Sequence, residues 1–234
     1  GEKFSGSLTA AIVREDGADK IELEEAYVES LSGSFLDNTF FKFGRAFWNV
    51  GVLNPQHAHA DDFADRPLPY RVFLNKAYND DGLEASYLLS GSGEIGLGVF
   101  RGDDFPYGNN NSQGSDSWSV YYKSNFALSN SEKLKFNLYH LSGKSENGRV
   151  SNEDTVTFRG DSDLSVISLD YENTYSSEGK FKISSEYFYR NQDGTFEDSE
   201  ASTGNVNFDD NDSGYYIALV NQFNDHLSLG LRYS

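Results

Sequence analysis

Apolar and aromatic residues recur at every second position through most of this chain. Over residues 4–13, Leu8, Ala10 and Ile12 fall on one face while Ser7 and Thr9 fall on the other. A period of two predicts β-strands, because successive side chains of a strand point to opposite faces. Eleven strands are predicted, at residues 4–13, 21–31, 40–47, 83–89, 94–101, 117–128, 133–142, 164–175, 180–190, 214–223 and 227–233.

The second of these segments is ambiguous. Ile21, Leu23 and Tyr27 alternate with glutamates, as in a strand, but the run Leu-Glu-Glu-Ala-Tyr at 23–27 would also suit a helix. We predict a strand there.

The connections between predicted strands alternate in length. Tight turns are expected at 90–93, 129–132, 176–179 and 224–226, and long polar loops at 48–82, 102–116, 143–163 and 191–213. Short periplasmic turns alternating with long extracellular loops are typical of outer-membrane barrels, and several strands have the length of a tilted membrane-spanning strand. The pattern therefore predicts an all-β, antiparallel transmembrane β-barrel, with a soluble β-sandwich as the alternative.

The same alternation gives each strand a direction. Strand one rises from the periplasm, so the N-terminus is predicted to be periplasmic and 48–82 to be an extracellular loop or one folded into the lumen. The eleventh strand then ends on the extracellular side, whereas bacterial barrels have an even number of strands. We therefore expect residues 1–234 to be one barrel domain, part of a longer barrel with 12 or more strands.

Composition narrows the class of protein further. Aromatic residues make up 15% of the 234 residues, with 22 glycines and only 4 prolines, which favours strands and turns. The absence of cysteine excludes disulfides and thiolate sites. A net charge of −18 argues against a nucleic-acid partner, because phosphate binding requires clustered Lys and Arg.

The densest chemistry lies in the first long loop, at 54–69. His57 and His59 point the same way in extended backbone, so both imidazoles can reach one divalent ion, with Asp61, Asp62 or Asp65 supplying oxygen. Zinc is the first candidate. The alternative is a Pro-braced loop whose histidines hydrogen bond to its own carboxylates.

Other polar residues suggest wet surfaces rather than catalysis. The acidic run at 209–214 favours solvated surface charge, with Ca²⁺ binding to the acidic loops as the alternative. No nucleophile, phosphate-binding loop or acid–base pair is identifiable, so no enzyme is predicted. Strand residues expected to face an aqueous lumen are Lys42, Arg45, Lys123, Lys135, Glu186 and Arg190.

The chain resembles a family of bacterial outer-membrane proteins described as zinc-regulated, TonB-dependent-receptor-like or porin-like. The resemblance is carried by LEEAY at 23–27, NPQHAH at 54–59, DFADRPL at 62–68, DDG at 80–82, FRGDDFP at 100–106, FRGDSDL at 158–164, EYF at 186–188, GYY at 214–216 and GLRY at 230–233. It implies a barrel in a Gram-negative outer membrane, a link to metal supply, and further strands beyond GLRY. With no separate plug domain and a length far below that of a 22-stranded receptor, energy-coupled uptake is not expected.

Two functions follow from this pattern. The first is a porin-like channel for divalent metal or small solutes, narrowed by the loop at 57–65. The second is a structural or interaction protein whose acidic outer loops bind divalent ions, lipopolysaccharide or other envelope proteins. Outer-membrane lipid is a partner in both.

Overall fold

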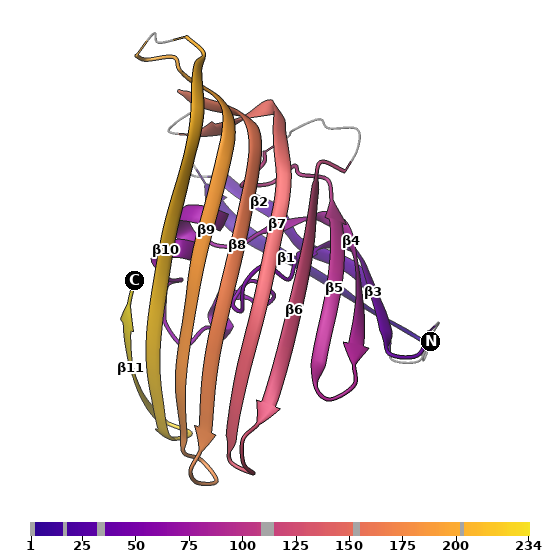
Figure 1. Cartoon of the computed structure of the whole chain (residues 1–234), viewed down its shortest axis with the longest axis vertical. Helices are drawn as coiled ribbons and strands as arrows, with labels where there is room; N and C mark the ends of the chain where they lie inside the picture. Colours follow the sequence, from indigo (N-terminus) through magenta and orange to yellow (C-terminus); the bar gives the residue numbers. More distant parts are fainter. Residues whose placement is uncertain (1–2, 16–17, 32–35, 109–114, 152–154, 202–203) are drawn as a thin grey trace.

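The computed structural model describes residues 3–15, 18–31, 36–108, 115–151, 155–201 and 204–234. These residues form one antiparallel sheet of eleven strands, each paired with the next in the chain (Figure 1). The strands are β1 (Phe4–Glu15), β2 (Ala18–Ser30), β3 (Thr39–Phe47), β4 (Asn79–Leu89), β5 (Gly93–Phe100), β6 (Ser117–Ala127), β7 (Glu132–Ser151), β8 (Val156–Thr174), β9 (Lys180–Asp198), β10 (Val206–Asn224) and β11 (Leu227–Tyr233). The predicted all-β antiparallel class is confirmed.

The ambiguous segment at 21–31 is a strand. β2 pairs with β1 along its whole length and with β3 from Ala26 to Glu29, so cross-strand pairing overrides the helical preference of its Glu and Ala residues. Gly44 opposes Tyr27 in this second pairing. Its φ is +126°, and a Cβ there would overlap the Ala26 carbonyl oxygen, so only glycine lets β2 and β3 approach this closely.

Two of the predicted long loops are wrong. Residues 143–151 continue β7 and 156–163 begin β8, while most of 191–213 extends β9 and β10. The tight turns all lie at the opposite end of the sheet, the lower end in Figure 1. The error has a physical cause: in the upper parts of β7–β10 the outward side chains become polar, so the apolar alternation fades although strand pairing continues.

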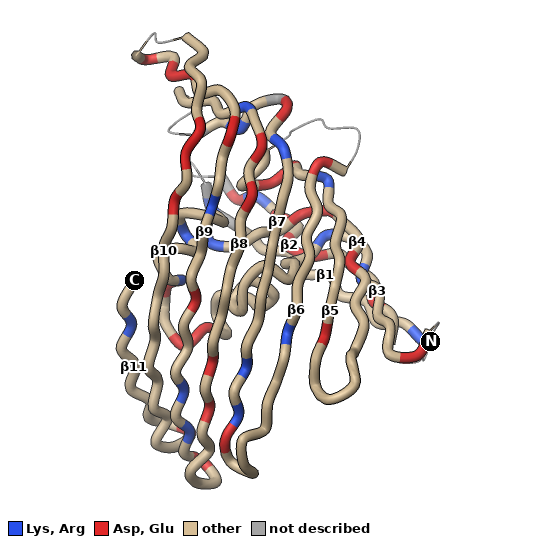
Figure 2. The backbone as a smooth tube through the Cα atoms, in the orientation of Figure 1, with Lys and Arg blue, Asp and Glu red and all other residues tan. Residues whose placement is uncertain are grey.

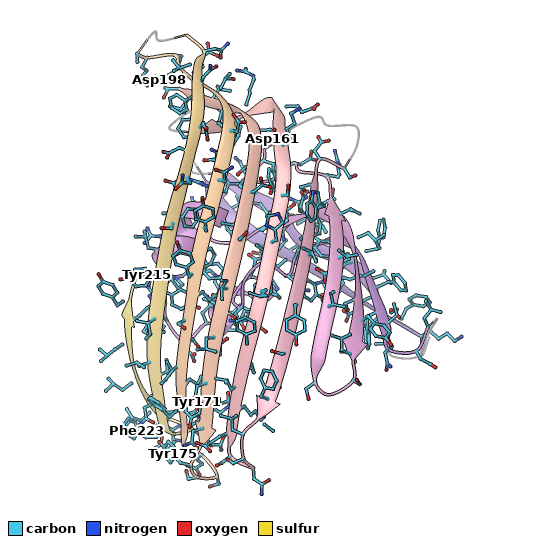
Figure 3. All side chains as sticks on the ribbon, viewed as in Figure 1. Asp161, Tyr171, Tyr175, Asp198, Tyr215 and Phe223 are labelled. Carbon is cyan, nitrogen blue, oxygen red and sulfur yellow. The ribbon has the colours of Figure 1, made fainter. Side chains whose placement is uncertain are left out.

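The sheet has an apolar convex face. On β10, Tyr215, Ile217, Leu219 and Phe223 are exposed, whereas the alternate residues, such as Tyr216, are buried on the concave side. Exposed apolar residues occupy the same face of the neighbouring strands, as do the aromatic residues Tyr171, Tyr175 and Phe223 near the tight turns (Figure 3). Acidic residues gather beyond this apolar zone, in the upper parts of β8, β9 and β10 (Figure 2).

The sheet is open along its edges. In the described part of the chain, β1 pairs only with β2 and β11 only with β10. No helix among the described residues is both long and apolar enough to cross a membrane.

Candidate functional site

The concave face of the sheet is occupied by residues 48–78, the connection between β3 and β4, called here the inner segment. It contains the 3₁₀ turn η1 (Ala58–Ala60) and the helix α1 (Leu68–Leu74), which lies behind β9 and β10 in Figure 1. Prolines at the start of α1 suit the first helical turn, where backbone N–H groups have no helical acceptor. Asn75 ends the helix in the left-handed conformation.

The inner segment contacts strands near both edges of the sheet, β2 and β11. His57 Nε2 lies 2.8 Å from the Glu25 carboxylate on β2, and Asp65 Oδ1 lies 2.9 Å from Arg232 on β11. The sheet therefore curves enough for strands β2 and β11 to contact one short stretch of chain, at 57–65. This stretch packs against the concave face of the sheet.

The two ends of the inner segment are tied together by Asn54, whose side chain is fully buried. The Asn54 amide donates to the carbonyl oxygens of Trp48 at 2.7 Å and Tyr78 at 2.8 Å, and its oxygen accepts the Tyr78 N–H at 2.7 Å. The Trp48 indole donates to the Asp80 carbonyl oxygen of β4 at 2.8 Å. These bonds satisfy backbone groups that would otherwise be buried without partners.

Glu186 of β9 holds the middle of the inner segment. Its Oε1 accepts the Val52 N–H at 2.9 Å, and its Oε2 accepts the hydroxyls of Tyr70 at 2.7 Å and Tyr216 at 2.8 Å. The side chain is only 2% exposed, so these bonds replace its hydration. Burial, and then the neighbouring Glu186 charge, raise the pKa of Tyr70 well above its ordinary value, so the hydroxyl stays a donor.

Arg66 holds the inner segment's own fold. Its Nε lies 3.1 Å from Asp61 Oδ2, with both side chains 4% exposed. The guanidinium also donates to the carbonyl oxygens of Lys76 at 3.0 Å and Gln56 at 2.6 Å. A planar fork with several donors suits this role, because one side chain bridges a carboxylate and two backbone segments.

The residues predicted to bind metal separate into different contacts. The rings of His57 and His59 stack with centroids 5.6 Å apart, but His57 also pairs with Glu25. Each of the three aspartates pairs with a different cation. Asp61 pairs with Arg66, Asp62 lies 3.1 Å from Lys182, and Asp65 lies 2.9 Å from Arg232. Among the residues that the structure describes, no group of three or more His, Cys, Asp or Glu is arranged to hold a metal ion.

Two of the polar strand residues expected to face a lumen behave differently from each other. Glu186 lies buried on the concave face, against the inner segment. Arg45 instead pairs with Asp81 and Asp104. It stands two residues after Phe43 on β3, and Phe43 is exposed. Burial raises the pKa of the Asp104 carboxyl, and the Arg45 charge acts against that rise.

Comparison with known proteins adds one relative. No protein-family model matches the chain. An uncharacterized protein of Aquifex aeolicus (strain VF5) is 25% identical over 212 residues, which cover 82% of this chain and 44% of the relative. The chain thus spans less than half the length of that protein.

The partners of Glu186 were not apparent in the sequence. Tyr70 follows the run Pro67-Leu68-Pro69 and is separated from Glu186 by 116 residues. The available signal was compositional: an apolar, aromatic stretch, Tyr70 to Tyr78, inside a loop otherwise rich in polar residues. Such a stretch indicates a loop that buries part of itself.

Proposed function

We propose that the chain forms a porin-like channel of the Gram-negative outer membrane, for small solutes or divalent metal, with the inner segment as its constriction. The supporting observation is that the sheet is apolar on both faces: Phe188 and Tyr216 belong to a buried core between the concave face and the inner segment, while Tyr215, Ile217 and Leu219 make the convex face apolar and exposed. Lipid is a suitable environment for such an outer face. Strand one would rise from the periplasm.

The height of the apolar zone supports this proposal. On β10 the zone runs from Tyr215 to Phe223, eight residues apart. These nine residues cover roughly 26 Å along the strand at about 3.3 Å per residue, and a tilted membrane-spanning strand has about 9–11 residues. Aromatic residues at both limits would lie at the two membrane interfaces, with the acidic upper strands outside.

Replacing Leu219 by arginine is expected to impair insertion into lipid. Leu219 lies midway between Tyr215 and Phe223, where a lipid-facing arginine costs about 2–4 kcal/mol. Folding into phospholipid vesicles, followed by the heat-dependent shift in gel mobility, measures the loss. Asn211→Arg is the matched control, because it adds the same single positive charge at an exposed position of β10 beyond the apolar zone. Equal insertion of both variants would contradict a membrane belt at these residues.

Single-channel recording in planar bilayers tests the channel itself. The length of the native protein is first to be determined by intact-mass measurement. We then expect ohmic conductance from the full-length protein. An open sheet leaves unpaired backbone groups, which lipid cannot satisfy, so we propose that β1 and β11 pair with further strands in the assembled barrel. Absence of conductance from correctly inserted protein would remove the channel proposal.

Zinc binding is proposed with His57 and His59 as its ligands, because their stacked rings are the members of the predicted set that lie side by side. Any ion there would compete with the contact between His57 and Glu25. Zinc calorimetry of the protein and of the His57→Ala, His59→Ala double variant tests this. We expect the double variant to lose the zinc isotherm; equal isotherms would exclude these ligands.

The alternative function, a structural protein that binds divalent ions, is favoured by one feature of β8–β10. Asp161, Asp193 and Asp209 are directly opposed on these three adjacent strands and are exposed. Like charges in register destabilise a sheet, and divalent cations or bridged lipopolysaccharide phosphates would relieve them. This function predicts Ca²⁺-dependent thermal stability in a protein without conductance.

A further inference from the structure

A cavity of about 310 Å³ lies on the concave side of β2–β6, beside the start of the inner segment. Its wall includes Lys42 of β3, Glu84 of β4, Glu94 of β5, Tyr121 of β6 and Asn49 of the inner segment. This volume is at the lower end of the range for small-molecule sites. The wall combines charges of both signs with aromatic rings.

Lys42 and Glu84 are direct cross-strand neighbours, yet they do not form an ion pair. Their Cα positions are partners in the β3–β4 register, which places opposite charges within easy reach. No ion pair joins them among the described residues; Lys42 Nζ instead lies 4.0 Å from the centre of the Tyr27 ring. Glu84 turns toward Asn49, whose amide donates to Glu84 Oε1.

Each of these two charged groups could form a further hydrogen bond or ion pair. Glu84 is 5% exposed, and its Oε2 has no hydrogen-bond partner in the described structure. The ammonium of Lys42 has a ring face but no carboxylate within ion-pair distance among the described residues. A buried oxygen of this kind normally has a donor, and an ammonium near it normally has an acceptor.

We propose that this cavity binds a small zwitterion, with the ligand's ammonium on Glu84 and its carboxylate on Lys42. Such a ligand would bridge these two charges, which are cross-strand neighbours but form no ion pair in the described structure, and Tyr121 and Phe41 would contact its apolar part. Small zwitterions would then be a solute class for the proposed channel. Their transport rests on the proposed function, whereas their binding to the cavity does not.

Calorimetry with L-leucine tests the site, using the full-length protein folded in detergent. Isoamylamine and isocaproate are the matched probes, since each lacks one of leucine's two charged groups. We expect leucine to bind more tightly than either probe, and Lys42→Gln and Glu84→Gln each to weaken leucine binding roughly tenfold to a hundredfold. Lys135→Gln, on β7 outside the cavity, should leave leucine binding unchanged.

Three results would overturn the proposal: no leucine binding by the folded protein, equal binding of leucine and isoamylamine, or unchanged binding in both cavity variants. Circular dichroism of each variant establishes that its β-structure is retained. The result is separable from the channel proposal. Leucine binding without conductance would leave the site and remove the channel, whereas conductance without leucine binding would do the reverse.

Discussion

Replacing Glu186 by alanine is expected to release the inner segment from the sheet. The Val52 N–H and the hydroxyls of Tyr70 and Tyr216 would lose their common acceptor while remaining buried. Leaving these groups without a partner costs about 3–5 kcal/mol of unfolding free energy. In the proposed channel, release of the inner segment should also raise single-channel conductance.

Fluorescence can follow this release directly. The chain has two tryptophans, of which Trp48 is 1% exposed in the inner segment and Trp118 is 45% exposed on β6. In a Trp118→Phe background, emission therefore reports the inner segment alone. We expect Glu186→Ala to shift the Trp48 emission to longer wavelength and to lower the urea midpoint.

Glu172→Ala is the matched control. Glu172 lies on the neighbouring strand β8, and its pairing with Lys180 at 3.4 Å is partly exposed, so its loss should cost less than about 1 kcal/mol. Glu186→Gln keeps one carbonyl acceptor and should fall between the wild type and Glu186→Ala. Identical Trp48 emission and conductance in Glu186→Ala and wild type would show that Glu186 does not hold the inner segment.

Replacing Arg66 by alanine is expected to unfold the inner segment locally. Asp61 would remain as a buried carboxylate without its cation, and two backbone carbonyls would lose their donor. Breaking one half of a buried ion pair costs about 3–5 kcal/mol. Limited proteolysis should cut the variant between residues 54 and 78 while the strands persist.

Arg71→Ala provides the comparison within the same helix region. Arg71 is half-exposed and lies 3.9 Å from Asp65, so its removal should leave the protease pattern unchanged. Arg66→Lys keeps the charge but not the planar fork, and we expect it to be cut at an intermediate rate. Equal resistance of Arg66→Ala and Arg71→Ala would show that Arg66 is dispensable.

Much of the sheet could be predicted because its signal is local. Along β10, alternation of exposed Tyr215, Ile217 and Leu219 with buried Tyr216 and Ala218 follows from strand geometry, which needs no information from distant residues. The same applies to the tight turns, where short polar runs interrupt that alternation. Where both faces are mostly polar, as in 191–198 of β9, the apolar alternation is absent and the sequence predicts a loop although the strand continues.

The candidate site was predicted only in part, because its contacts depend on distant residues. The rings of His57 and His59 do stack, but they do so at the 3₁₀ turn η1 and not in the extended backbone that was expected. Nothing local indicated that Asp62 would pair with Lys182, or Asp65 with Arg232, more than a hundred residues away. These partners are available only because the sheet curves around the inner segment.

By itself, then, the sequence determined the antiparallel β-class, the order of strands and the positions of the tight turns at 90–93, 129–132, 176–179 and 224–226, since each depends on side-chain period and turn chemistry. The tertiary structure decided how far β7–β10 continue, because backbone pairing persists after the apolar signal ends. It also decided that the long connection at 48–78 folds inward. That placement depends on Glu186 meeting Tyr70, a contact that forms only once the distant strands curve around the segment.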